Sequence, residues 1–279
     1  MLDELFFKKS GDRHRANYVV YSFVLTLIGF FTALLLFPRA ISYTFPLIVT
    51  LLFIPGFRKL IRGEELEVIK KRKLSRVLYY HSDVAEIVFF VFIGVFLAVL
   101  LIELVAVSRP DFFQSAFEYQ ITTLNDVQEY TYSITDGLMG ETFDLSTYKN
   151  IGGIFAGVLL LLTFGFVFGL FYGGGGILLI ILAASHLATL VVYMLASRGE
   201  FFGYFLLTAL LQVFLIVPLI FSAIGGCILS KAAAREKVKS KNFHLVLLDS
   251  LLLYGFAIIL SVVLIVIWNL LIRVMSNAA

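Results

Sequence analysis

Long apolar runs separated by shorter polar segments form the main pattern of this chain. A helix that crosses the hydrocarbon core of a bilayer needs about 20 mostly apolar residues, and it satisfies its backbone hydrogen bonds within its own segment. The pattern therefore predicts an all-α, polytopic transmembrane bundle, with a single integral membrane domain over residues 1–279. Its seven hydrophobic segments are Tyr18–Phe37, Ser42–Phe57, Ala85–Val107, Ile151–Tyr172, Ile177–Ala196, Phe201–Ala223 and Phe243–Leu271.

Prolines and glycines divide these runs further. Pro46 and Pro55 predict a tight outer turn and an inner helix end for the second segment. The stretch Ile151–Ala196 is too long for one crossing, and glycine favours turns over helix. We therefore predict a glycine-broken hairpin here, either two full crossings or a re-entrant pair. The break is formed by Gly173, Gly174, Gly175 and Gly176.

Basic residues are concentrated in three of the polar segments. Residues 1–17 contain four lysines and arginines, residues 58–84 contain eight and Lys231–Lys241 contains five, whereas Ser108–Asn150 contains two beside seven acidic residues. Cytoplasmic loops are enriched in Lys and Arg. We therefore predict a cytoplasmic N-terminus (1–17), basic cytoplasmic segments at 58–84 and 231–243, an acidic extracytoplasmic loop at 108–150 and an extracytoplasmic C-terminus. One bent crossing at Ile151–Ala196 would move Lys231–Lys241 outside, so the hairpin or the re-entrant pair is favoured.

The segment 58–84 has the pattern of an amphipathic helix in two pieces, broken at Gly63. Basic residues lie around its apolar stripe. They either bind anionic lipid headgroups, at about 1 kcal/mol each, or serve only to fix the topology. The stripe consists of Leu74, Val77, Leu78, His81 and Ala85, and the candidate headgroup ligands are Lys70, Lys71, Arg72, Lys73 and Arg76.

The acidic loop carries an apolar stripe of its own at helical spacing. It consists of Phe113, Phe117, Ile121 and Leu124. A loop of this length with its own periodicity is expected to be structured. It is either a docking face or a cap over a cavity, or else a helix packed on the membrane surface or on the top of the bundle.

Composition supports the membrane assignment. Hydrophobic residues make up 60% and charged residues 15% of the chain, against about 45–50% and about 25% in soluble proteins. The net charge of +3 gives no indication of a nucleic-acid partner, and the one cysteine, Cys227, excludes an intramolecular disulfide framework and a multi-cysteine metal site. The N-terminal residues lack a convincing signal-peptide cleavage site, so the first segment is expected to act as its own signal anchor.

Few strongly polar residues lie within the predicted spans. Ser185, His186 and Thr189 lie near the middle of one span, where a histidine is either functional or a hydrogen-bonded link between helices. Asp249 is expected to reach water or the basic loop. Gln212 lies in mid-span, and we expect the residues near helix ends to reach the interface; these are Glu86, Glu103 and Asn269.

No catalytic arrangement is visible, and we expect neither enzymatic activity nor a cofactor. The glycine run lacks the lysine and hydroxyl residue of a phosphate-binding loop. It is either a tight turn or a break in mid-membrane that lines a substrate site, as in some transporters.

One arrangement resembles a known family. Tyr148-Lys149-Asn150 precedes a span with Gly152, Gly153, Gly157, Gly165 and Gly169, and His186 lies ten residues beyond the glycine run. Over roughly the second half of the chain, this order is similar to archaeal members of the stage II sporulation protein M family. The chain departs from the family pattern at Lys149, where the family has asparagine, and at Leu187 and Leu190, where it has glycine and glutamate. The resemblance implies a membrane scaffold and no catalytic residues.

Three functional hypotheses follow. The first is a non-enzymatic scaffold or assembly protein of the cell membrane, in contact with anionic lipid and with a protein partner at the outer loop. The alternative is a small channel, transporter or lipid-translocating protein that uses the glycine break and His186. An intramembrane enzyme is the weakest of the three. A homodimer is the default oligomer.

Overall fold

The computed structural model describes residues 16–71, 77–122, 146–171, 175–196, 202–237 and 239–278. Within these ranges the chain is helical apart from short turns, which confirms the predicted all-α fold. A short helical stretch, 118–122, follows α5. The main helices are α2 (Ala16–Leu36), α3 (Ile41–Lys71), α4 (Val77–Ala106), α5 (Pro110–Ala116), α7 (Ser146–Leu170), α8 (Gly175–Ala196), α9 (Phe202–Arg235) and α10 (Lys241–Ala278).

Six of these helices, α2, α3, α4, α8, α9 and α10, are long and apolar enough to cross a membrane. Helix α7 has 25 residues and contributes a shorter apolar stretch, Phe155–Leu170. Large apolar side chains are exposed along the helices, for example Leu35 at 81% and Val105 at 67%. Soluble monomers rarely expose apolar surface on this scale. The chain is therefore a multi-pass membrane protein, and its orientation stays a prediction.

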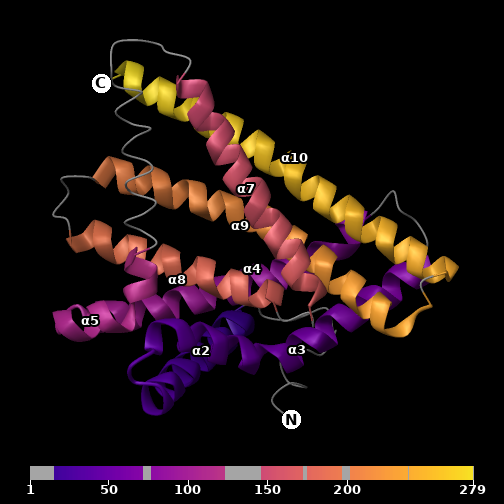
Figure 1. Ribbon diagram of the computed structural model, residues 1–279, viewed down its shortest axis with the longest axis horizontal. Helices are drawn as coiled ribbons and strands as arrows, with labels where there is room; N and C mark the ends of the chain where they lie inside the picture. Colours follow the sequence, from indigo (N-terminus) through magenta and orange to yellow (C-terminus); the bar gives the residue numbers. More distant parts are fainter. Residues whose placement is uncertain are drawn as a thin grey trace.

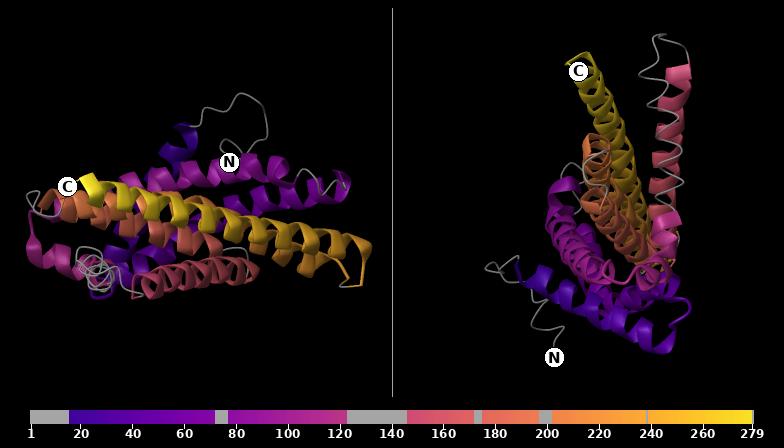
Figure 2. Two further views of the ribbon diagram at one scale, coloured as in Figure 1. Left: turned by 90° about the horizontal axis from the view of Figure 1, so that it is seen from above. Right: turned by 90° about the vertical axis from the view of Figure 1, so that its left-hand side faces the viewer.

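The helices form an elongated bundle (Figure 1). Helices α2 and α3 lie at one edge, α4, α8 and α9 in the middle, and α7 and α10 at the other edge (Figures 1 and 2). The most extensive contacts join α9 to α10, α7 to α9 and α2 to α4. We call the end that carries α5 the α5 end; α9 and α10 are connected at the opposite end (Figure 1).

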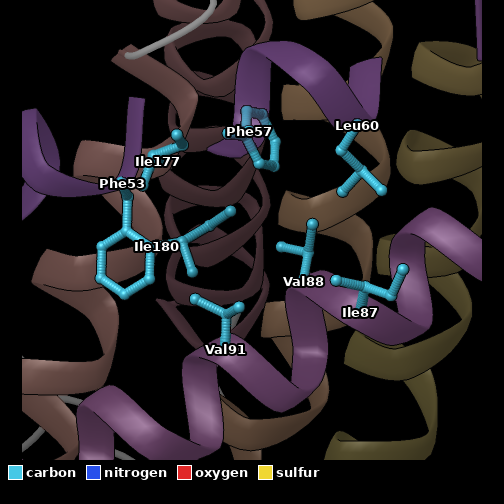
Figure 3. Close-up of a pocket in the computed structure, with 8 residues that line it drawn as sticks. All are labelled: Phe53, Phe57, Leu60, Ile87, Val88, Val91, Ile177 and Ile180. Carbon is cyan, nitrogen blue, oxygen red and sulfur yellow. The ribbon is translucent and has the colours of Figure 1, made fainter. Parts of the chain in front are cut away.

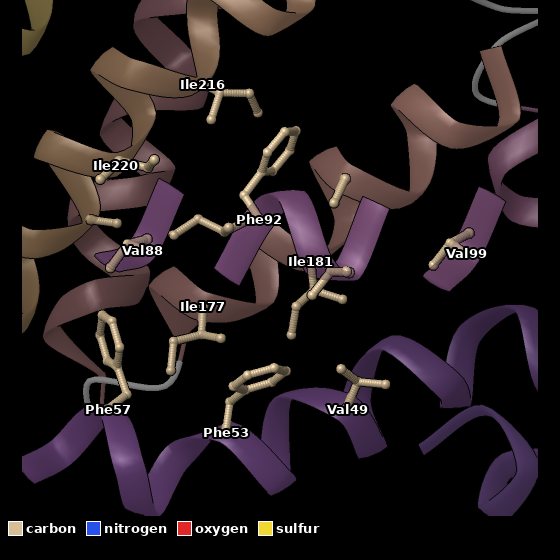
Figure 4. Close-up of a cluster of buried hydrophobic side chains, with 14 of the residues drawn as sticks. Val49, Phe53, Phe57, Val88, Phe92, Val99, Ile177, Ile181, Ile216 and Ile220 are labelled. Carbon is tan, nitrogen blue, oxygen red and sulfur yellow. The ribbon is translucent and has the colours of Figure 1, made fainter. Parts of the chain in front are cut away.

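The main hydrophobic core lies where α3, α4, α8 and α9 meet. Figure 4 shows Phe53 of α3, Phe92 of α4, Ile181 of α8 and Ile220 of α9 directed into it, and all four are buried. Part of this core, between α3, α4 and α8, encloses a cavity of about 20 Å³ that is lined by eight apolar residues (Figure 3). A water molecule needs polar partners in such a space, so we expect this small cavity to be dry.

The prolines of α3 do not end the helix, and the predicted turn at Pro46 and helix end at Pro55 are wrong. Helix α3 is continuous from Ile41 to Lys71. A proline removes one backbone hydrogen bond, and membrane helices tolerate this loss because neighbouring groups compensate. Phe53 and Phe57 are buried on either side of Pro55, and their packing holds the helix in place across it.

The predicted break at Gly63 is also wrong, since α3 runs through it. One glycine costs a helix only about 1 kcal/mol. The segment 58–84 thus consists of the end of α3 and the start of α4. Lys70 and Lys71 end α3, without a described side-chain position, and the other candidate headgroup ligands, Arg72, Lys73 and Arg76, lie outside the described residues.

Helix α9 extends beyond the predicted end at Ala223 to Arg235. The first part of the predicted basic segment 231–243 is therefore helical, because alanines favour helix and a basic residue in the last turn complements the helix dipole. Its last residues, from Lys241, belong to α10. The glycine break is likewise shorter than predicted. Gly175 and Gly176 form the first turn of α8, whereas Gly173 and Gly174 lie outside the described residues.

The apolar stripe of the outer loop packs on the bundle, as one of the two interpretations predicted. Phe117 is fully buried, with its ring stacked on Phe30 at a centroid distance of 6.1 Å. Phe113 and Ile121 pack against the same core. Leu124 and most of the acidic residues of this loop lie outside the described residues. The described part therefore covers the α5 end of the bundle.

Candidate functional site

Ser185 of α8 belongs to a buried polar cluster at the α5 end. Gln120 donates from Nε2 to Ser185 Oγ at 3.1 Å, and Ser42 of α3 donates from Oγ to Gln120 Oε1 at 3.0 Å. The backbone N–H of Tyr119 donates to Ser42 Oγ at 2.7 Å. Ser185, Gln120 and Ser42 are buried. The cluster therefore links α3 and α8 to the segment that follows α5.

Glu103 of α4 continues this cluster. Its Oε1 lies 2.6 Å from Thr189 Oγ1, which is also 3.1 Å from the carbonyl oxygen of Ser185. Glu103 is 0% exposed, and its Oε2 has no hydrogen-bond partner among the described residues. The prediction that Glu103 reaches the interface is wrong, because α5 and the segment after it pack over this end of the bundle.

His186 lies on an adjacent face of α8. Its Nδ1 forms no hydrogen bond with the described part of the chain. The ring of Tyr119 lies beside it, at a centroid distance of 5.6 Å. The Nδ1 atom of His186 therefore does not form the hydrogen bond between helices that one of the two alternatives predicted. The ring instead forms part of a cavity wall.

This cavity, of about 270 Å³, lies between α7, α8 and α9. Ligand pockets typically begin at about 300 Å³, so its size is close to that of a small binding site. The lining includes three polar residues, Tyr119, His186 and Gln212, and none of its residues is charged. The wall is mainly aliphatic, with Leu179, Leu182 and Leu187 on α8 and Leu215, Ile216 and Leu219 on α9.

The wall of the cavity is partly exposed at the surface of the bundle. Leu161 of α7 lines the cavity and is 36% exposed. Phe164 of α7 and Phe214 and Val217 of α9 are exposed apolar side chains on the same two helices. Because α8 and α9 are long and apolar enough to span a membrane, we expect this exposed part of the wall to face lipid hydrocarbon.

Small residues let α7 cross α9 at close range near one end of the cavity. A side chain at Gly169 of α7 would meet the carbonyl oxygen of Ala223, and a side chain at Gly226 of α9 would overlap the carbonyl of Phe166. Ser222 Oγ donates to the carbonyl of Leu162 at the same crossing. Small residues allow such approach of membrane helices. From this crossing α7 diverges from α8 toward the α5 end (Figure 1).

A second polar contact joins α4 to α10 at the opposite end. His81 Nε2 lies 2.8 Å from Asp249 Oδ2, and both side chains are buried. The prediction that Asp249 reaches water or the basic loop is therefore wrong. His81 belonged to the apolar stripe predicted for 58–84. It lies in α4, which begins at Val77, and it is buried against α10.

Sequence reasoning found Ser185, His186, Thr189 and Gln212 but missed their partners. Gln120 and Ser42 gave no signal, because Ser42 is the first residue of a predicted apolar segment and Gln120 lies in the long acidic loop, where a polar residue does not stand out. For Glu103 and His81 the sequence did contain a signal, because an ionisable residue on a predicted apolar helix needs a partner.

The described residues contain no group of three or more histidines, cysteines, aspartates and glutamates that could hold a metal ion. Cys227 is buried in α9 beside Gly176 of α8. The lining of the cavity can contact hydrocarbon through its leucines and can hydrogen-bond to a polar group beside His186.

Comparisons with protein families, with curated proteins and with solved structures gave no match. The resemblance to the stage II sporulation protein M family stays a prediction from the sequence.

Proposed function

We propose that this protein binds an uncharged lipid, whose hydrocarbon chain occupies the cavity between α7, α8 and α9. The observation that carries the proposal is the placement of this 270 Å³ cavity against two helices that are long and apolar enough to span a membrane, α8 and α9, with an exposed leucine of α7, Leu161, in its wall. This corresponds to the lipid-handling side of the alternative hypothesis drawn from the sequence.

Hydrocarbon is the natural occupant of such a cavity, but it gives little selectivity. Lipid tails are as apolar as leucine, so entry of a chain from the bilayer gains packing contacts and little hydrophobic free energy. Selection must therefore come from the polar groups in the wall. His186 provides an imidazole nitrogen, Gln212 an amide and Tyr119 a phenol.

These polar groups favour an uncharged ligand. A charged headgroup that is buried without a counter-charge is strongly disfavoured, and the lining residues carry none. A hydroxyl or carbonyl group, by contrast, can hydrogen-bond to imidazole or amide. We therefore assign the ligand to lipids with a chain and a small neutral polar group, such as long-chain alcohols.

The scaffold hypothesis is not the basis of this proposal. Its predicted docking face is the acidic segment 108–150, and residues 123–145 of that segment lie outside the described part of the chain. A scaffold role and a lipid site are compatible in one protein.

Photolabelling of the purified protein in nanodiscs tests the proposal. The probe is a long-chain alcohol with a diazirine on its chain, and labelled peptides are identified by mass spectrometry. We expect labelling of residues 179–187 and 212–219, which carry the α8 and α9 walls. A leucine in place of Ala183 would fill part of the cavity. We therefore expect Ala183→Leu to reduce this labelling roughly tenfold, which corresponds to a loss of about 1.4 kcal/mol in binding free energy.

The matched control is Ala156→Leu, which adds the same side chain on an exposed position of α7. Its labelling should equal that of the wild type. The corresponding fatty acid, which is charged, should label the cavity more weakly than the alcohol. Labelling spread evenly over all lipid-exposed helices, and insensitive to Ala183→Leu, would show only annular lipid and would refute the proposal.

A further inference from the structure

The carboxyl group of Glu103 occupies an unusual position for an acid. It is fully buried between α4 and α8, with one hydrogen-bonding partner, Thr189 Oγ1, and one oxygen, Oε2, without a partner in the described chain. An ionised carboxylate in such surroundings needs a cation or several donors. Asp249, the other buried acidic residue of the described chain, has His81 at 2.8 Å.

The surroundings of Glu103 supply no counter-charge by hydrogen bond or ion pair within the described chain. The titratable groups near this end are His186 and Tyr193 on α8, Tyr119 after α5, Tyr43 on α3 and two exposed acids of the α5 segment, Asp111 and Glu118. None of these groups is bonded to Glu103. The basic residues of the neighbouring turns, Arg39 and Arg109, are exposed.

Counting protons at Thr189 indicates how the contact is made. A hydroxyl group has one proton to donate, but Thr189 Oγ1 lies within hydrogen-bonding distance of two acceptors, Glu103 Oε1 and the carbonyl oxygen of Ser185. Both contacts become hydrogen bonds if Glu103 is a neutral acid. Its O–H then donates to Thr189 Oγ1, and Thr189 donates to Ser185.

We propose that Glu103 is a proton-binding site, which is occupied by a proton when α4 and α8 are packed as in this structure. The neutral acid leaves only a carbonyl-like oxygen unpartnered, at a far smaller cost than a buried charge. Loss of the proton would leave a carboxylate with one donor, so the charge would have to reach water and the α4–α8 contact would loosen. Thr189 lies within one turn of His186, so the proton site and the cavity share this part of α8.

Infrared spectroscopy at neutral pH of the protein purified in a detergent that has no carbonyl group tests this inference, because lipid esters would absorb in the same region as a protonated carboxyl group. A protonated carboxyl group gives a C=O stretching band apart from the amide bands, whereas a carboxylate does not. We expect this band in the wild type and its loss in Glu103→Gln. Two controls should keep the band: Glu118→Gln, at an exposed position, and Asp249→Asn, at the other buried acid.

A second variant covers the case in which Glu103→Gln does not fold. Thr189→Val keeps the shape of the side chain and removes the hydroxyl, so the band should persist but change frequency as its hydrogen bond is lost. A wild-type spectrum without the band, or a band that neither Glu103→Gln nor Thr189→Val alters, would overturn the inference. No lipid ligand is present in this experiment, so its result is independent of the proposed function.

Discussion

At the end of the bundle opposite α5, the buried side chains of His81 and Asp249 hydrogen-bond to each other in place of water. Both side chains are buried, and the bond between Nε2 and Oδ2 joins α4 to α10 across 168 residues of sequence. Two polar groups that satisfy each other inside a protein are close to neutral for stability, but either one alone is costly. The pair therefore acts as a constraint on which helices can meet here.

Removal of one partner should destabilise the protein strongly. We expect His81→Ala to lower the free energy of unfolding by about 3–5 kcal/mol, because Asp249 is then buried without its partner. The double variant His81→Leu with Asp249→Leu should lower the free energy of unfolding less than His81→Ala does, since it leaves no polar group unpaired. SDS titration in mixed micelles, followed by circular dichroism, measures both values.

His244 provides the matched control for this prediction. It is exposed near the start of α10, so His244→Ala should change stability by no more than about 0.5 kcal/mol. If His81→Ala lowers the free energy of unfolding no more than this control does, then the bond between His81 and Asp249 does not hold α4 and α10 together as the structure implies.

At the scale of single residues, the sequence predicted where polar groups lie along the helices but not which groups meet. Ser185, His186 and Thr189 stood out because they interrupt an apolar segment. Their partners, Gln120 and Glu103, come from elements 65 and 86 residues away. Sequence spacing within one helix contains no information on such long-range pairs, so the buried cluster could be found only from the packed bundle.

At the scale of whole elements, the crossing of α7 and α9 sets the geometry of the cavity. Gly165 and Gly169 of α7 lie against Leu219, Ser222 and Ala223 of α9. The backbones are close at this point, and α7 diverges from α8 beyond it. A larger side chain at the crossing would push the helices apart, and the divergence that forms the cavity would change with it.

Two glycine variants separate the effect of packing from that of helix propensity. A Cβ at Gly226 would overlap the carbonyl of Phe166, whereas a Cβ at Gly157 has nothing within 4 Å. Both changes to alanine favour helix by about 1 kcal/mol. We expect Gly226→Ala to destabilise the protein by about 1–3 kcal/mol through overpacking, and Gly157→Ala to be neutral or stabilising. Equal stability of the two variants in SDS titration would contradict the close crossing.

The positions of the helices were largely predictable, and their ends were not. An apolar run of sufficient length has one stable backbone form in hydrocarbon, and each of the seven predicted segments corresponds to one described helix, apart from residues at its ends. Pro55, Gly63 and the stretch after Ala223 suggested ends from local preference alone. Helix α3 continues because packing outweighs a loss of a few kcal/mol, and α9 continues because alanines favour helix.

At the scale of the whole molecule, charge and shape together predict the orientation. The exposed Lys237 lies between α9 and α10, at the end opposite α5, and the exposed Asp111 lies in α5. The described part of the predicted basic segment 231–243, which connects α9 to α10, lies at the first of these ends, and α5, at the start of the acidic segment, lies at the second (Figure 1). The enrichment of cytoplasmic loops in Lys and Arg therefore places Lys237 inside and Asp111 outside.

Cysteine labelling in intact cells tests this orientation. The wild type provides a clean background, because its one cysteine, Cys227, is buried. A membrane-impermeant maleimide should label Asp111→Cys in intact cells and Lys237→Cys only after the membrane is permeabilised. Labelling in the opposite order would reverse the predicted orientation but keep a bundle that spans the membrane. Labelling of both positions from the same side would contradict the spanning bundle itself, since α5 and the α9–α10 connection lie at opposite ends of its long axis (Figure 1).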